Sequence, residues 1–157
     1  MARKSSAILL LETMAMDAAK VRYPAAASCG ALAPRKYNDT TANGLTKAII
    51  DFLQLNGWRA ERIAVQGRCI DKTQVVTDVL GGRKRIGSVS WIPGQMTPGS
   101  ADISATIRGR SVKIEVKQKD RQSEAQKRYQ ESIERAGGTY IIARSFDQFL
   151  EWYNEFI

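Results

Sequence analysis

The chain has 157 residues, 43% of them hydrophobic, and carries 24 lysines and arginines against 16 aspartates and glutamates. This length suffices for one domain with its own core. The net charge of +8 favours a polyanionic partner, although a merely basic soluble protein stays an alternative. Because histidine is absent, the sequence excludes Ser-His-Asp and Cys-His catalysis and histidine-bound zinc. Any chemistry must come from carboxylates, lysine, tyrosine and a metal ion.

The sequence indicates a cytoplasmic location. Cys29 and Cys69 form no zinc motif, and we interpret them as free thiols in a reducing compartment. No apolar run approaches the ~18 residues of a membrane-spanning helix. Glu12 interrupts the short apolar stretch near the start, so we expect no signal peptide.

Residues 1–37 are expected to be an N-terminal extension, and residues 38–157 to form the main domain. Ser5 to Lys20 has apolar residues at helical spacing and predicts a short helix. Tyr23 to Arg35 is rich in alanine, contains two prolines and a glycine, and predicts a linker. Such an extension would be mobile or would dock as an arm on a partner subunit.

The main domain is predicted to begin with a helix from about Ala42 to Leu55, with N-cap side chains before it and Asn56-Gly57 after it. Alternation and turn residues then predict three strands and a turn at Gly81-Gly82. The predicted strands are Trp58–Val65, Thr73–Val79 and Ile86–Ile92. Pro93 to Gly99 is a predicted loop.

Most of the candidate catalytic residues lie in a predicted hairpin from Gly99 to Asp120. With a two-residue turn at Arg108-Gly109, Asp102 lies directly opposite Glu115. Opposed residues share a face of the sheet with Cβ atoms about 4.5–5.5 Å apart, so these carboxylates would repel each other unless a cation lay between them. The pattern therefore predicts a site for a hard metal ion, with Lys117 on the same face.

A plainer interpretation is that the charged face of this hairpin is simply solvated, as in many antiparallel sheets. The turn decides whether the carboxylates meet at all. Arg108 would have to accept a positive φ in a type I′ turn. A loop longer or shorter by one residue would place the two carboxylates on opposite faces.

The C-terminal part is predicted to form a helix from Ser123 to about Ala136, a strand over Thr139–Ala143 and a last helix. Capping boxes are predicted at Ser123 with Gln126 and at Ser145 with Gln148. The aromatic residues of the last helix are expected to be core residues. The order of elements favours a mixed α/β or α+β domain with a central sheet.

The segment Gly99-Ser100-Ala101-Asp102, followed after twelve residues by Glu115-Val116-Lys117, resembles the motif of the PD-(D/E)xK nuclease superfamily and its VRR-NUC-like branch. The resemblance covers about residues 38–157, including Gln126 and Tyr129 on the next helix. Ala101 stands where the family often has proline. Asn43 or Thr46 stands where many relatives have a glutamate. The resemblance implies a restriction-endonuclease-like core, with a central mixed sheet flanked by helices.

The resemblance also implies a metal-dependent DNA endonuclease that acts as a homodimer on branched, Holliday junction-like DNA. Asp102, Glu115 and the carbonyl oxygen of Val116 would bind Mg²⁺ or Mn²⁺. Lys117 would orient or activate the attacking water, and Gln126 would hold that water or a phosphate oxygen, unless it serves only as a helix cap. Residues expected to contact nucleic acid are Arg62, Arg85, Lys119, Arg121 and Tyr129.

Two other functions remain open from the sequence. A catalytically silent DNA-binding module on the same fold would keep the charge without turnover. A basic RNA-binding protein would explain the charge but not the paired carboxylates.

Overall fold

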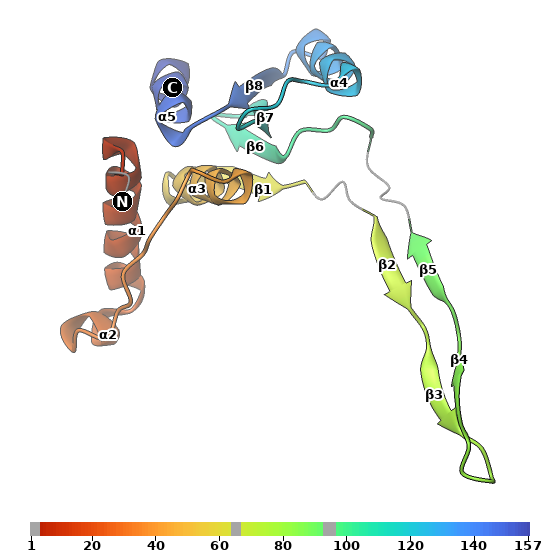
Figure 1. Cartoon of the computed structure of the whole chain (residues 1–157). Helices are drawn as coiled ribbons and strands as arrows, with labels where there is room; N and C mark the ends of the chain where they lie inside the picture. The colour runs from red at the N-terminus through yellow and green to blue at the C-terminus, as the bar shows by residue number, and fades with distance from the viewer. Residues whose placement is uncertain (1–3, 64–66, 93–96) are drawn as a thin grey trace.

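A four-stranded mixed sheet lies at the centre of the structure (Figure 1). The computed structural model describes residues 4–63, 67–92 and 97–157. In spatial order the strands are β1 (Arg59–Arg62), β6 (Ile103–Ile107), β7 (Arg110–Val116) and β8 (Thr139–Ala143). The pairs β1–β6 and β6–β7 are antiparallel, whereas β7 and β8 run parallel. The predicted mixed α/β class with a central sheet and flanking helices is confirmed.

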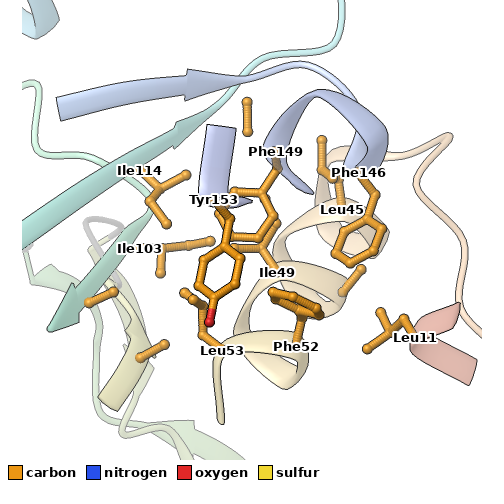
Figure 2. Packing of buried hydrophobic residues seen from close by; sticks show 14 of the residues in the cluster. Leu11, Leu45, Ile49, Phe52, Leu53, Ile103, Ile114, Phe146, Phe149 and Tyr153 are labelled. Carbon is orange, nitrogen blue, oxygen red and sulfur yellow. The ribbon is translucent and has the colours of Figure 1, made fainter. Parts of the chain in front are cut away.

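The helices lie on both sides of this sheet. They are α1 (Ser6–Arg22), α2 (Pro24–Ser28), α3 (Ala42–Leu55), α4 (Glu124–Arg135) and α5 (Phe146–Phe156). Helices α3 and α5 pack on the apolar face of the sheet, and Figure 2 shows Phe52 of α3 among the aromatic rings of α5. Helix α4 packs against β8 and contacts the polar face through Gln126. The aromatic residues predicted for the core are confirmed there: Phe146, Phe149 and Tyr153 are buried, and Leu150 and Phe156 pack against them.

Helix α1 packs against its own chain rather than extending from it. Its stripe of small and aliphatic side chains meets α3 and α5, and Ile8 and Leu11 are fully buried in the common core. The helix was predicted. The structure shows it packed into the common core, and not as a mobile extension or as an arm on a partner subunit. The predicted linker contains the short helix α2, which Pro24 begins.

The hairpin β6–β7 has the predicted register, since Ile107 pairs with Arg110. Arg108 and Gly109 adopt φ values of 50° and 75°, both positive as a type I′ turn requires. Arg108 is held in this conformation by a hydrogen bond from its guanidinium to the backbone oxygen of Ile157. Alternation is also as predicted: Ile103 and its odd-numbered neighbours on β6 are buried, and the intervening residues are more exposed.

The two capping boxes differ. As predicted, the Ser123 hydroxyl accepts from the backbone N–H of Gln126, and the Gln126 side chain accepts from the backbone N–H of Ser123. At α5 the Ser145 hydroxyl accepts a hydrogen bond from the backbone N–H of Gln148. The side-chain carbonyl of Gln148, however, accepts from the backbone N–H of Arg144 instead of that of Ser145. The second capping box is therefore only half formed, because Gln148 reaches one residue further back.

A second β structure projects away from the central sheet as a long two-stranded ribbon (Figure 1). Its strands are β2 (Arg68–Asp71), β3 (Gln74–Thr77), β4 (Arg83–Ile86) and β5 (Val89–Ile92). The strand predicted over residues 86–92 is interrupted at Gly87 and Ser88, and β2 was not predicted. The strand predicted over residues 73–79 is observed only over Gln74–Thr77, because Val79 and Leu80 lie in the turn that Gly81 and Gly82 close through backbone hydrogen bonds with Asp78. The end of the strand predicted over 58–65 and most of the loop predicted over 93–99 lie outside the described residues.

Candidate active site

Asp102 and Glu115 come together at the open end of the β6–β7 hairpin. Ile103 pairs with Ile114, so Asp102 and Glu115 occupy the next opposed position on the polar face. The Asp102 carboxylate also accepts a hydrogen bond from the backbone N–H of Val116, at 2.9 Å. This bond fixes one oxygen of Asp102 beside the main chain of β7. The juxtaposition predicted from the turn is therefore present.

Glu115 is not on a solvated face, because it is only 3% exposed. One carboxylate oxygen, Oε1, lies 3.2 Å from the ammonium nitrogen of Lys117 and accepts a hydrogen bond from the side-chain amide of Gln126. The other oxygen, Oε2, is buried and has no hydrogen-bond partner among the described residues. A buried carboxylate oxygen without a partner is costly. The plainer interpretation of a solvated charged face is wrong at this position.

Electrostatics make this glutamate unusual. Burial, and secondly the neighbouring charge of Asp102, raise the pKa of Glu115 above its ordinary range. Lys117 and Gln126 act in the opposite direction, because both stabilise the ionised carboxylate. A further cation or hydrogen-bond donor at Oε2 would therefore stabilise the ionised carboxylate.

Lys117 follows directly after β7 and continues its pairing with β8, since its backbone N–H donates to the carbonyl of Ala143 at 3.0 Å. Its side chain is largely buried beside Glu115. The strand thereby places the ammonium two residues beyond the glutamate on the same face, as the alternation of a strand requires.

Gln126 makes two side-chain hydrogen bonds at once: the predicted helix cap, and a bond to Glu115 that was not predicted. Its carbonyl oxygen accepts from Ser123 N at 2.9 Å, and its NH₂ group donates to Glu115. Both bonds fit one rotamer because an amide side chain carries an acceptor and a donor at opposite corners. The helix cap therefore positions a donor on the carboxylate.

Tyr140 lies near the two carboxylates and packs against Tyr129. The rings of Tyr129 and Tyr140 pack edge to face with centroids 6.3 Å apart. Burial raises the pKa of Tyr140 to about 12, and the charges of Glu115 and Asp102 contribute to the same increase. Tyr140 was not among the site residues predicted from the sequence. It lies opposite Lys113 on the face that bears Glu115, and this position depends on the parallel pairing of β7 with β8, which the sequence alone did not indicate.

The other predicted site residues are dispersed. Arg62 lies on β1 opposite Ile103, and its guanidinium donates to Asn43 Oδ1 at 2.8 Å. Lys119 and Arg121 are exposed in the segment between β7 and α4. Arg85 is not with this group. It lies on the projecting ribbon, where a guanidinium nitrogen is 3.6 Å from a carboxylate oxygen of Asp71.

The first helix supplies no acid to the site. Thr46 is buried, and its hydroxyl donates to the carbonyl of Ala42. Asp51, the only carboxylate of α3, accepts a hydrogen bond from the hydroxyl of Tyr37 at 2.8 Å. Over residues 4–63, 67–92 and 97–157, no group of three or more aspartate, glutamate, histidine and cysteine residues could hold a metal ion. Among the described residues, the carboxylates of Asp102 and Glu115 are therefore the acidic groups of this site that could ligate a metal ion.

Comparisons with known proteins give no relative: no family model, no curated protein and no solved structure matches the chain. In the described part of the chain, no helix combines the length and apolar character needed to cross a membrane.

Proposed function

We propose that the chain is a metal-dependent DNA endonuclease that hydrolyses phosphodiester bonds, built on a restriction-endonuclease-like core of the PD-(D/E)xK type. One observation carries the proposal. Glu115 is buried beside Asp102, and one of its oxygens has no partner among the described residues. A divalent cation with a preference for oxygen ligands satisfies that oxygen and offsets the repulsion between the two carboxylates.

Asp102, Glu115 and the main-chain carbonyl of Val116 would hold Mg²⁺ or Mn²⁺, because hard cations take carboxylate and carbonyl oxygens. When bound, such an ion polarises the scissile phosphate and makes a water molecule more acidic. Lys117 contributes a fixed positive charge beside the reacting phosphate, where negative charge develops in the transition state. Gln126 keeps the Glu115 carboxylate oriented through its amide.

The substrate class rests on charge and on the family resemblance. A net charge of +8 favours a polyanion. Arg62, Lys119 and Arg121 are exposed and available to contact phosphates. Branched DNA and a homodimer, as in Holliday junction resolvase-like members of the VRR-NUC-like branch, belong to the same proposal.

A catalytically silent DNA-binding module is the second candidate. Lys117 and Gln126 already occupy Oε1 of Glu115, so the cluster partly satisfies itself. The absence of a third acid among the described residues favours this candidate as well.

Cleavage of labelled linear, flapped and four-way DNA, with Mg²⁺, Mn²⁺ or EDTA, tests the proposal. The wild type is compared with Glu115→Gln, and Glu61→Gln on the exposed edge strand serves as a matched control. Metal-dependent cutting that is lost in Glu115→Gln and kept in Glu61→Gln supports the nuclease. Tight binding to DNA without cutting on any substrate supports the silent module, and a preference for structured RNA contradicts both.

A further inference from the structure

The projecting ribbon is one continuous structure over residues 68–92. Asp71 pairs with Val89 in its first half, and Gln74 pairs with Ile86 in its second, three residues further along each strand. The register is therefore unbroken from base to tip. The backbone N–H of Lys72 donates to the carbonyl of Ser88 at 3.0 Å and connects the two halves.

The ribbon is exposed on both faces. Within the described residues, no third strand pairs with it, and all eight residues of β3 and β4 are exposed. Its exposed large hydrophobic side chains are Val75, Val76, Val79, Leu80, Ile86, Val89, Trp91 and Ile92. An isolated two-stranded hairpin is at best marginally stable in water. A binding partner that covers the ribbon would stabilise it.

The charge of the ribbon indicates which partner this is. Residues 67–92 contain five lysines and arginines and two aspartates, a net charge of +3. Asp71 is engaged by Arg85, and the carboxylate of Asp78 accepts from two backbone N–H groups at the tip. Among the described residues, Lys72, Arg83 and Lys84 have no ion-pair partner and are exposed. Two such ribbons would repel each other, whereas a polyanion would attract them.

The dimensions fit duplex DNA. Each side of the ribbon has about ten residues, which at about 3.3 Å per residue span roughly 33 Å, close to the ~34 Å of one turn of B-DNA. A two-stranded β-ribbon is one of the two elements that the major groove admits. At the tip, the apolar side chains of Val79 and Leu80 are 102% and 93% exposed. Such residues contact thymine methyl groups or insert between base steps.

The segments on either side of the ribbon are hydrogen-bonded to residues at the candidate site. Ile63, just before the ribbon, donates its backbone N–H to the carbonyl of Asp102 at 2.8 Å. Thr97, just after it, accepts from the hydroxyl and the N–H of Ser100. Both strands of the ribbon therefore originate from segments that contact the site region.

We propose that residues 68–92 form a DNA-binding arm that lies along a groove of duplex DNA, with Lys72, Arg83 and Lys84 on phosphates and the Val79-Leu80 tip against the bases. This inference rests on the proposed function for its choice of DNA as the substrate. It adds a second contact region, in which the arm holds the flanking duplex while the carboxylate site lies at the point of cleavage.

Equilibrium binding of the full chain to a fluorescein-labelled 30-base-pair duplex, in EDTA and over a range of salt concentrations, tests the arm. The triple variant Lys72→Gln, Arg83→Gln, Lys84→Gln is compared with Lys20→Gln, Arg22→Gln, Lys36→Gln, which makes the same charge change on an exposed surface of the N-terminal region. Loss of three phosphate contacts lowers the slope of log K against log salt by about 2.7. We expect binding at least tenfold weaker for the arm variant and a slope near wild type for the control.

A second variant tests the tip separately. Val79→Ser with Leu80→Ser should weaken duplex binding without changing the salt slope, because no charge is lost. Wild-type affinity and slope in both arm variants would overturn the arm, as would a wild type that does not bind the duplex. The arm would also be overturned if sedimentation velocity showed that the tip variant converts a dimer into a monomer while DNA binding is unchanged, because the ribbon would then serve self-association.

The two proposals fail independently, since binding in EDTA requires no cleavage. A chain that binds duplex through the arm and cuts no substrate refutes the endonuclease and leaves the arm standing. A chain that cuts DNA and binds it equally well without the arm cations refutes the arm alone.

Discussion

Gln126 connects the N-terminus of α4 to the buried carboxylate of Glu115 through the two ends of one amide. Its carbonyl accepts from the backbone of Ser123, and its NH₂ group donates to Oε1 of the glutamate. The position of the helix and the orientation of the carboxylate are thereby coupled. A change at Gln126 should affect both stability and the site.

Gln126→Ala removes half of a capping box and one donor from Glu115. The Ser123 hydroxyl still caps the helix, so the loss from the cap is at the low end of the about 0.5–2 kcal/mol that removal of an N-cap costs, and the carboxylate loses its neutral partner as well. We expect a lower urea midpoint together with loss of metal-dependent cleavage. Gln148→Ala is the matched control, because Gln148 bonds the backbone before α5 and no carboxylate. Equal cleavage by the two variants would contradict a role for Gln126 in the site.

Gly109→Ala tests the turn that sets the register of the hairpin. Gly109 has a φ of 75°, and a Cβ there would meet no atom within 4 Å, so the cost is purely conformational. A non-glycine residue in the left-handed region costs roughly 1–2 kcal/mol. We expect this loss in urea unfolding, with the fold retained. Gly57→Ala, also at positive φ and in open space, should cost a similar amount without affecting cleavage. An unchanged urea midpoint for Gly109→Ala would contradict the type I′ turn.

Insertion of one glycine after Gly109 is a more severe test of the same register. The longer loop would shift one strand by a residue and place Asp102 and Glu115 on opposite faces of the hairpin. We expect a large loss of stability, because the apolar face of the strand would turn to solvent. Circular dichroism and thermal melting measure this loss. A variant as stable as the wild type would contradict the register argument.

Leu11→Ala tests whether α1 belongs to the domain. Leu11 is fully buried in the common core, whereas Leu10 on the same helix is 48% exposed. Truncation of a buried leucine costs about 2–5 kcal/mol, so Leu11→Ala should lower the free energy of unfolding strongly. Leu10→Ala should change it by less than about 0.5 kcal/mol, as is usual for surface substitutions. Equal effects in chemical denaturation would restore the idea of a separate N-terminal extension.

The elements that were predictable from sequence are those whose signals are local. The turn at Arg108-Gly109 and the alternation of β6 and β7 determined the pairing, and with it the opposition of Asp102 and Glu115. What could not be predicted depends on contacts between distant segments. A helix such as α1 has the same spacing of apolar residues whether it covers its own domain or a partner.

Burial was the second kind of property that the sequence did not reveal. Alternation puts Glu115 on the polar face, but only the packing of α4 through Gln126 shows that this face is covered there. The ribbon is similar. Its alternation resembles that of any strand, and nothing local distinguishes a strand of the central sheet from one that projects away from it.

Divalent cations should stabilise the wild type through Glu115. A ligand that binds only the folded state adds about 2.7 kcal/mol to the free energy of unfolding at 100 times its Kd. Mn²⁺ should therefore raise the melting temperature of the wild type. Glu115→Gln should show no such increase, because an uncharged amide neither repels Asp102 nor attracts the ion as a carboxylate does.

Without metal, Glu115→Gln should melt at or above the temperature of the wild type. Burial and Asp102 destabilise the ionised glutamate by more than Lys117 and Gln126 stabilise it, so the uncharged amide avoids a net cost. Glu61→Gln, an exposed carboxylate on β1, should leave the melting temperature and its response to Mn²⁺ unchanged. Thermal melting in EDTA and in Mn²⁺ measures all three proteins. Equal Mn²⁺ responses in the wild type and Glu115→Gln would show that the ion binds elsewhere and would remove the main support for the nuclease.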